Sequence, residues 1–206
     1  MFKGMWALAI WDDKKKEIIL SRDRFGEKPL YYSLLNKEFF FSSQIKQIQH
    51  LSKKKLTIDD KQIINFLALG YRSLNKFKFN FFKNIYKVPN ASYIKFNGKK
   101  LIKKKYWKLN YNPNHNINES CIIKSVRRKV INAVNRITTS DVPISLMLSG
   151  GIDSNIISSV VQKVLKKKLH SFSIVDKDPR YNENLLIDHV VKTNTLKSKY
   201  LQYLKN

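Results

Sequence analysis

The sequence contains a single cysteine, Cys121, among its 206 residues. One thiol cannot form an internal disulfide framework or supply a zinc site that depends on several cysteines. The sequence also lacks any apolar run of the roughly 18 residues that a membrane-spanning helix requires. Its first 11 residues show no small-residue cleavage site of the kind that ends a signal peptide. We therefore expect a cytoplasmic protein that has no membrane partner.

Arginine is scarce although the chain is strongly basic. The 40 Lys+Arg and 15 Asp+Glu give a formal net charge of +25, but only 7 of the 40 cations are arginine. Arginine is the side chain best suited to bidentate contacts with phosphate and guanine. The chain also has 19 Asn and 22 Ile, which share A/T-rich codons with lysine. We expect the charge to reflect background composition, whereas the alternative, a basic nucleic-acid-binding module, predicts clustered arginine and interleaved aromatics.

Short apolar segments predict strands in the first half of the chain. The nearly continuous apolar run at residues 5–11 predicts a strand that is buried on both faces. Asn97-Gly98 predicts a hairpin, and Asp59 predicts the start of a helix. Further strands are expected at residues 17–20, 30–32, 38–41, 92–96 and 100–102.

The second half of the chain has a different periodicity. Isoleucine and valine recur at helical spacing between residues 119 and 138, which predicts an amphipathic helix. A short strand, a glycine turn, a second helix and another strand follow within about thirty residues, and this order predicts a right-handed βαβ unit with a parallel sheet. The two strands are expected at 144–148 and 170–175, with a helix between them and another at 182–191.

The segment LMLSGGIDS at residues 146–154 is the part of the sequence that indicates chemistry. Gly150 and Gly151 allow backbone N–H groups to approach a ligand without an intervening Cβ. These N–H groups and the start of the next helix can form an anion site. The hydroxyls of Ser149 and Ser154 can add donors to phosphate oxygens. The spacing fits neither a Walker loop nor a dinucleotide-binding fingerprint.

Asp153 distinguishes a phosphate site with a metal ion from a site for a bare anion. A carboxylate beside phosphate oxygens is typical of magnesium, which prefers one or two carboxylates plus phosphate. The alternative is an ordinary strand–turn–helix connection in which Ser or Asp caps the helix. We favour phosphate binding because the segment lies within a predicted βαβ unit.

Several motifs together resemble the glutamine-hydrolysing asparagine synthases. SGGIDS at 149–154 resembles the SGGxDS pyrophosphate loop of ATP pyrophosphatases, and GMWALAIWD at 4–12 is similar to that family's GMFAFAIWD. SRDRFGEKPLYY at 21–32 resembles its ARDRFGEKPLYY, and this stretch is specific to the family. Independently of the resemblance, we expect Gly26 and Pro29 to shape a turn there while Arg22, Asp23 and Arg24 pair locally, a structural role without catalysis.

The resemblance implies a fold in two parts. Residues 1–109 would be the second part of a class II glutaminase domain with an α+β N-terminal-nucleophile fold. Residues 110–118 would be a linker, and residues 119–206 would begin an α/β adenylating PP-loop domain with a parallel sheet. The family's N-terminal cysteine nucleophile would lie outside this chain. We therefore expect an internal fragment that is inactive alone, with Cys121 as a small structural residue.

The resemblance also implies a reaction. ATP would adenylate the side chain of aspartate and release pyrophosphate, and ammonia from glutamine would then displace AMP to give asparagine. The substrates would be aspartate, glutamine and ATP, with Mg²⁺ bound near Asp153 and no catalytic residue in this chain. A related enzyme that amidates another carboxylate, or an inactive gene fragment, are the alternatives. The expected ATP-binding residues are Met147, Leu148, Ser149, Gly150, Gly151, Asp153, Ser154 and Ile174.

Overall fold

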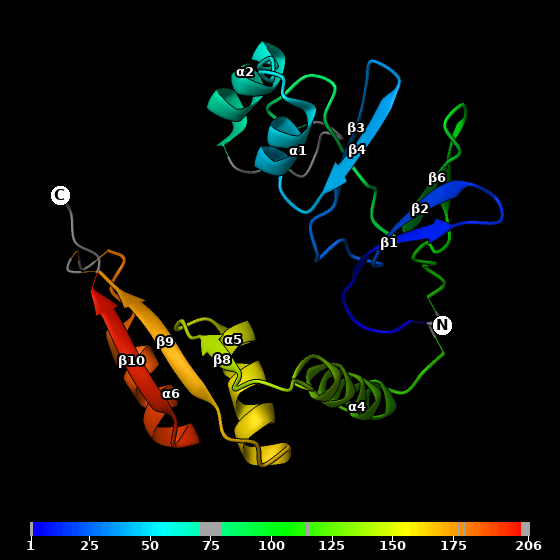
Figure 1. The fold of residues 1–206 in the computed structure, drawn as a ribbon. Coiled ribbons are helices and arrows are strands. Elements are labelled where there is room, and N and C mark those ends of the chain that lie inside the picture. The colour runs from blue at the N-terminus through cyan, green and yellow to red at the C-terminus, as the bar shows by residue number, and fades with distance from the viewer. Residues whose placement is uncertain (1, 71–79, 114–115, 177, 179, 203–206) are drawn as a thin grey trace. The chain divides into compact units, whose positions relative to one another are not determined.

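The computed structural model describes residues 2–70, 80–113, 116–176, 178 and 180–202. The chain divides into two compact units, Met1–Asn112 and Pro113–Asn206. Each unit has its own sheets and its own buried apolar cluster (Figure 1). Among the described residues, no helix combines the length and apolar character needed to cross a membrane.

The first unit contains two antiparallel sheets. One has the strand order β1-β2-β6-β7 and the other the order β4-β3-β5. The predicted Asn97-Gly98 hairpin is confirmed, because Phe96 pairs with Leu101. The buried cluster of this unit consists of Leu20, Leu30, Tyr32, Val88 and Ile94. The elements are β1 (Ala7–Asp12), β2 (Glu17–Arg22), β3 (Tyr31–Leu35), β4 (Glu38–Ser42), α1 (Ile45–Ser52), α2 (Asp60–Leu69), β5 (Tyr86–Lys87), β6 (Ser92–Phe96) and β7 (Leu101–Lys105).

Strand β1 corrects one prediction. The apolar run at residues 5–11 was expected to be buried on both faces, but Ile10 is 49% exposed and Trp11 is 56% exposed. The reason is that β1 lies at the edge of its sheet and pairs with β2. Ile10 and Trp11 are adjacent and lie on opposite faces of β1, so each face of this edge strand carries an exposed apolar side chain. A continuous apolar run therefore indicated a strand correctly but not its burial.

The turn after β2 is held by Arg22, which is buried. Its guanidinium donates to the backbone carbonyls of Lys28 at 2.6 Å, Val88 at 3.0 Å and Gly26. Gly26 has a φ of +69°, and a Cβ at this position would lie 2.8 Å from Cζ of Arg22. Glycine is therefore required here both by the backbone conformation and by the close approach of the guanidinium.

Asp23 completes this turn through backbone contacts. Its carboxylate accepts hydrogen bonds from the N–H groups of Phe25 at 3.1 Å, Glu27 at 3.0 Å and Lys28 at 3.1 Å. The expected local pairing of Arg22 with Asp23 is thus replaced by bonds from each side chain to the backbone. Charged groups that bond to buried backbone atoms satisfy donors and acceptors that the turn would otherwise leave unpaired.

The Asp23 carboxylate should make the first unit sensitive to acid. Burial alone raises the pKa of Asp23, but the N–H groups of Glu27, Lys28, Gly26 and Phe25 outweigh burial and hold this pKa below its ordinary value. A lowered pKa in the folded state stabilises the fold above the unfolded-state pKa of about 3.9, and this contribution is lost as the pH falls through the folded-state pKa. We expect Asp23→Asn to unfold more easily than the unmodified chain at pH 7. Urea unfolding at pH 7, 4 and 3 should show this difference shrinking with acid, and a difference that stays constant would contradict the prediction.

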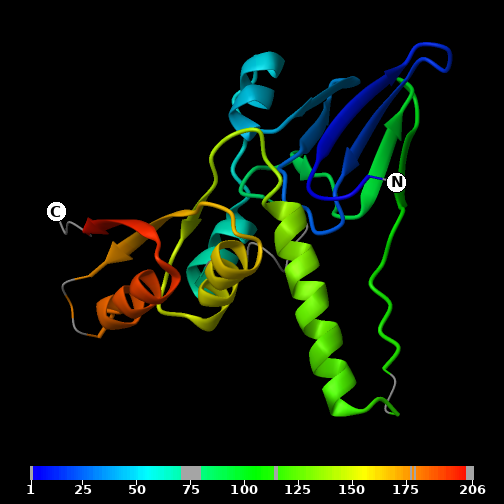
Figure 2. The ribbon, with the colours of Figure 1, turned by 90° about the horizontal axis from the view of Figure 1, so that it is seen from below.

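The second unit contains a three-stranded parallel sheet. The strand order is β10-β9-β8, and Met147 on β8 pairs with Phe172 on β9 in parallel register. The predicted βαβ unit is therefore confirmed. Helices α5 and α6 lie on the same side of the sheet (Figure 2), as expected for two successive right-handed crossovers. The elements are α4 (Glu119–Ile137), β8 (Ser145–Met147), α5 (Ile152–Ser159), the π-helical turn η2 (Val160–Val164), β9 (His170–Val175), α6 (Asn184–Asn194) and β10 (Lys197–Gln202).

The core of the second unit lies between the sheet and its helices. Val134 from α4, Val161 from η2 and Ile187 from α6 are among its buried residues. Cys121 is exposed near the start of α4, and its role as a small structural residue stays a prediction. Only the carboxyl-terminal part of α4 reaches this core, and Cys121 lies at the opposite end of the helix.

Candidate functional site at the end of the parallel sheet

The SGGIDS loop follows the carboxyl end of β8. The N–H of Leu148 donates to the carbonyl of Phe172 at 2.8 Å, which fixes the start of the loop against β9. Gly151 is the N-cap of α5. Ligands of open α/β sheets bind beyond the carboxyl ends of the strands, and the loop lies at that edge.

The hydroxyl of Ser154 organises the loop. It lies 3.0 Å from the carbonyl oxygen of Ser149 and 3.1 Å from the carbonyl oxygen of Gly151. The two hydroxyl oxygens of Ser149 and Ser154 are 3.1 Å apart. Asn155 adds a contact from its side-chain amide to the carbonyl of Gly150 at 3.3 Å. The serines expected to contact phosphate are thus brought together, and in this structure they bond within the loop.

The backbone N–H of Gly150 is directed at an anionic oxygen. It donates to Oε2 of Glu183 at 2.9 Å. The N–H of Gly151 donates to Oγ of Ser149 at 3.2 Å. The loop therefore binds a carboxylate oxygen through Gly150, and the same donor fits a phosphate oxygen.

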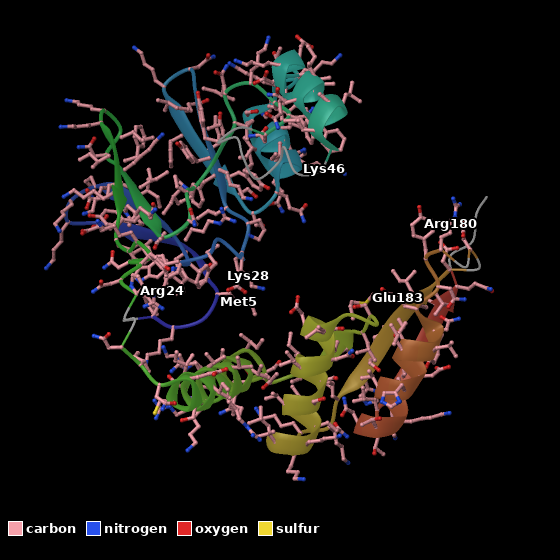
Figure 3. The ribbon with its side chains drawn as sticks, turned by 180° about the vertical axis from the view of Figure 1, so that it is seen from behind. Met5, Arg24, Lys28, Lys46, Arg180 and Glu183 are labelled. Atoms are coloured by element: carbon pink, nitrogen blue, oxygen red, sulfur yellow. The ribbon has the colours of Figure 1, made fainter. Side chains whose placement is uncertain are left out.

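Glu183 was not among the residues expected at the site. It precedes α6 (Figure 3), and it reaches the loop through tertiary structure. A Cβ on Gly150 would lie 3.0 Å from Cβ and Cδ1 of Leu186 and 3.3 Å from Cβ of Glu183. Glycine at 150 therefore allows the start of α6 to pack directly on the loop. A Cβ on Gly151 would meet only Oγ of Ser149, at 3.3 Å.

The residues expected near adenosine lie on two faces of the sheet. Met147 is 57% exposed and Ile174 is 60% exposed, and both lie on the same face as Phe172 because Met147 pairs with Phe172. Leu148 is 3% exposed and belongs to the buried core. The side chains of Met147 and Ile174 are accessible to a ligand, whereas Leu148 could contact one only through its backbone.

Asp153 is exposed in the first turn of α5. In the described part of the chain, no group of three or more His, Cys, Asp or Glu residues could hold a metal ion. A metal at Asp153 would therefore take its further ligands from outside such a cluster, for example from substrate phosphates and water. This fits Mg²⁺, which commonly takes one carboxylate together with substrate phosphates and water.

A parallel sheet with a glycine loop after its strand β8, joined in sequence to a unit of antiparallel sheets, defines a two-part protein of mixed α/β class. Residues 1–107 match the family model described as a glutamine amidotransferase domain. Residues 125–203 match the model described as asparagine synthase. The chain therefore belongs to the glutamine amidotransferase family and includes the start of an asparagine synthase domain.

Curated relatives match most of the chain. A Methanocaldococcus jannaschii protein, named provisionally as a glutamine-hydrolyzing asparagine synthetase 2, is 35% identical over 196 residues, covering 92% of this chain and 37% of that protein. The glutamine-hydrolyzing asparagine synthetase 2 of Bacillus subtilis is 30% identical, covering 90% of this chain and 26% of that protein. Amidase chyE of Penicillium rubens is 28% identical over 80% of this chain and 24% of its own length. The chain thus spans 37% or less of the length of each of these relatives.

Proposed function

We propose that this chain is part of an ATP-dependent, glutamine-hydrolysing asparagine synthetase, a carbon–nitrogen ligase. The loop at residues 149–154 carries the proposal. It lies at the carboxyl end of a parallel sheet, within the range matched by the asparagine synthase model, and the N–H of Gly150 holds a carboxylate oxygen. The relatives named as asparagine synthetases support the same reaction.

In the proposed reaction, the side-chain carboxylate of aspartate attacks the α-phosphorus of ATP. The bond to pyrophosphate breaks, and the product is a β-aspartyl-AMP mixed anhydride. Ammonia derived from glutamine then attacks the acyl carbon, and AMP leaves with the bonding electrons. A carboxylate is a poor electrophile, so the conversion of its oxygen into an AMP leaving group provides the driving force for amidation.

The loop residues would stabilise the departing pyrophosphate. Gly150 and Gly151 would donate backbone N–H groups, and Ser149 and Ser154 would donate hydroxyls to its oxygens. Asp153 would hold Mg²⁺, which neutralises the charge that develops on the pyrophosphate. The exposed apolar side chains of Met147 and Ile174 would lie beside the adenosine.

The two units would have separate roles in this proposal. Residues 1–109 would form the second part of an N-terminal-nucleophile glutaminase domain, supported by the match to the glutamine amidotransferase model. Residues 110–118 would link it to the PP-loop domain that begins at residue 119. We assign no glutaminase nucleophile within residues 1–206. A cytoplasmic location follows from the proposed use of ATP and aspartate, and no nucleic-acid partner is part of the proposal.

Asp153→Asn tests the reaction and the role of the metal. Pyrophosphate release that depends on aspartate would be measured with the full-length enzyme supplied with ammonia. We expect Asp153→Asn to lower this rate about 100-fold, because a neutral amide oxygen is a weaker magnesium ligand than an anionic carboxylate oxygen. The fold should be retained, since the loss of an acidic residue from a helix's first turn costs only about 0.3–1 kcal/mol. Unchanged turnover in this variant would contradict the metal role, and no aspartate-dependent release by the unmodified enzyme would contradict the function.

A second candidate function is the amidation of a different carboxylate. The similarity to amidase chyE favours it, because that relative carries a different name from the synthetases. The two functions can be separated by supplying ATP and ammonia with aspartate or with a panel of other carboxylic acids. Pyrophosphate release with another acid, but none with aspartate, would support the second function.

A further inference from the structure

The side chain of Glu183 does not cap helix α6, although the residue occupies the N-cap position. Its Oε2 atom instead accepts the N–H of Gly150 at 2.9 Å (Figure 3 labels Glu183 on the segment between β9 and α6). A carboxylate from another element therefore occupies a backbone donor of the candidate phosphate loop.

This contact places Glu183 in competition with phosphate. A phosphate oxygen can take the N–H of Gly150 only if the carboxylate moves away, because one N–H makes one well-directed hydrogen bond. A carboxylate that remains nearby also repels the phosphate, since like charges a few ångströms apart oppose each other. A magnesium ion on the phosphate reduces that repulsion because it neutralises negative charge.

We propose that Glu183 is a specificity-determining residue that makes the loop select magnesium-loaded over magnesium-free polyphosphate. The inference rests on the proposed function, in which the loop binds the pyrophosphate part of ATP. Glu183 holds the Gly150 N–H and raises the energetic cost of admitting an uncompensated polyanion. Magnesium-bound ATP carries less net charge and displaces the carboxylate more readily.

The packing of α6 on the loop does not depend on the charge of Glu183. Leu186 forms the closest contact, because its Cβ and Cδ1 would lie 3.0 Å from a Cβ on Gly150. Glu183→Gln keeps the length of the side chain and an oxygen that can accept the Gly150 N–H. This substitution therefore removes the negative charge while the loop keeps its neighbours.

Calorimetric binding of pyrophosphate to the full-length enzyme tests the proposal. The two probes are sodium pyrophosphate with EDTA and pyrophosphate with saturating Mg²⁺. We expect Glu183→Gln to bind the magnesium-free probe about 10-fold more tightly than the unmodified enzyme, which corresponds to about 1.4 kcal/mol. The gain for the magnesium-loaded probe should be less than about 3-fold, because Mg²⁺ already offsets the repulsion.

Glu119→Gln is the matched control. Glu119 lies in the first turn of α4 in the same unit, is exposed, and makes the same change in net charge when it is replaced by glutamine. The Glu119→Gln variant should bind both pyrophosphate probes with unchanged affinity. If it gains as much affinity for the magnesium-free probe as Glu183→Gln does, the effect is one of overall charge and the proposal is overturned.

Two other results would also overturn the role of Glu183. Equal affinity of Glu183→Gln and the unmodified enzyme for the magnesium-free probe would show that the carboxylate does not compete. Weaker binding of both probes by Glu183→Gln would show that Glu183 supports the loop or the metal instead. If the unmodified enzyme binds neither probe, the proposed pyrophosphate site itself fails, and that result is distinct from the other two.

Discussion

Replacing Gly151 with valine is expected to lower aspartate-dependent pyrophosphate release at least about 100-fold, the scale of losing a preorganised donor to a developing charge. The branched side chain would stand beside the N–H groups of Gly150 and Gly151, where phosphate oxygens must approach to about 3 Å. The fold should survive. Gly151 has a φ of −73° and a ψ of 152°, which valine adopts readily, and a Cβ there would meet only Oγ of Ser149 at 3.3 Å. Replacing Gly151, the N-cap of α5, with a poor N-cap residue lowers the free energy of unfolding by about 1 kcal/mol.

Gly150→Val is the contrasting variant. Its Cβ would lie 3.0 Å from two atoms of Leu186, so α6 would have to shift. We expect this variant to lose activity and much of its thermal stability, whereas Gly151→Val should lose activity with only a small fall in melting temperature. Pyrophosphate release and the melting temperature of the two full-length variants provide the comparison. Full turnover by Gly151→Val would show that the loop is an ordinary strand–turn–helix connection.

Local patterns in the sequence were sufficient to predict the βαβ unit of the second domain. The apolar strand before Ser149, the two glycines and the helical spacing after Asp153 are contiguous, so short-range signals define them. The last strand, β10, was not predicted. Its sequence, KSKYLQ, is mostly polar, and it forms because it pairs along its length with β9. Pairing of this kind depends on tertiary structure, which overrides weak local preference.

Helix α1 was also missed in the first unit. It spans Ile45–Ser52, and Ile48 is the one buried side chain among the described residues of this helix. Eight residues with one buried position give too little periodicity for a sequence-based prediction. The burial of β1 was wrong for a related reason, since the sequence of a strand does not reveal whether it lies at the edge of a sheet.

The candidate site was predictable only in its contiguous part. Ser149, Gly150, Gly151 and Ser154 lie within six residues and meet in one loop. Glu183 comes from a segment more than thirty residues later, so its contact with Gly150 depends on how α6 packs. Its position could not be inferred without the structure.

The opposite orientation of two neighbouring residues could have been predicted. Met147 and Leu148 are adjacent, and successive side chains of a strand point to opposite faces. A ligand on one face of the sheet can therefore contact only one of these two side chains. The structure places Leu148 in the core and leaves Met147 exposed.

Arg22→Met should have the largest effect on the stability of the first unit. Methionine keeps the apolar stem but removes all the donors that hold the carbonyls of Gly26, Lys28 and Val88. Each buried acceptor left without a partner costs about 1–3 kcal/mol. We expect a total loss of about 3–5 kcal/mol in the free energy of unfolding, the range for breaking a buried charged network.

Tryptophan fluorescence during urea unfolding of the 206-residue chain measures this loss, because Trp6, Trp11 and Trp107 all lie in the first unit. Arg22→Lys is the second variant. It keeps the charge but not the planar fork, so it should recover only part of the stability and remain measurable if Arg22→Met fails to fold. Lys46→Met on the exposed surface of α1, in the same unit as the tryptophans, is the control, with an expected change within about 0.5 kcal/mol. If Arg22→Lys unfolds at the same urea concentration as the unmodified chain, the bonds from the Arg22 guanidinium do not stabilise this turn.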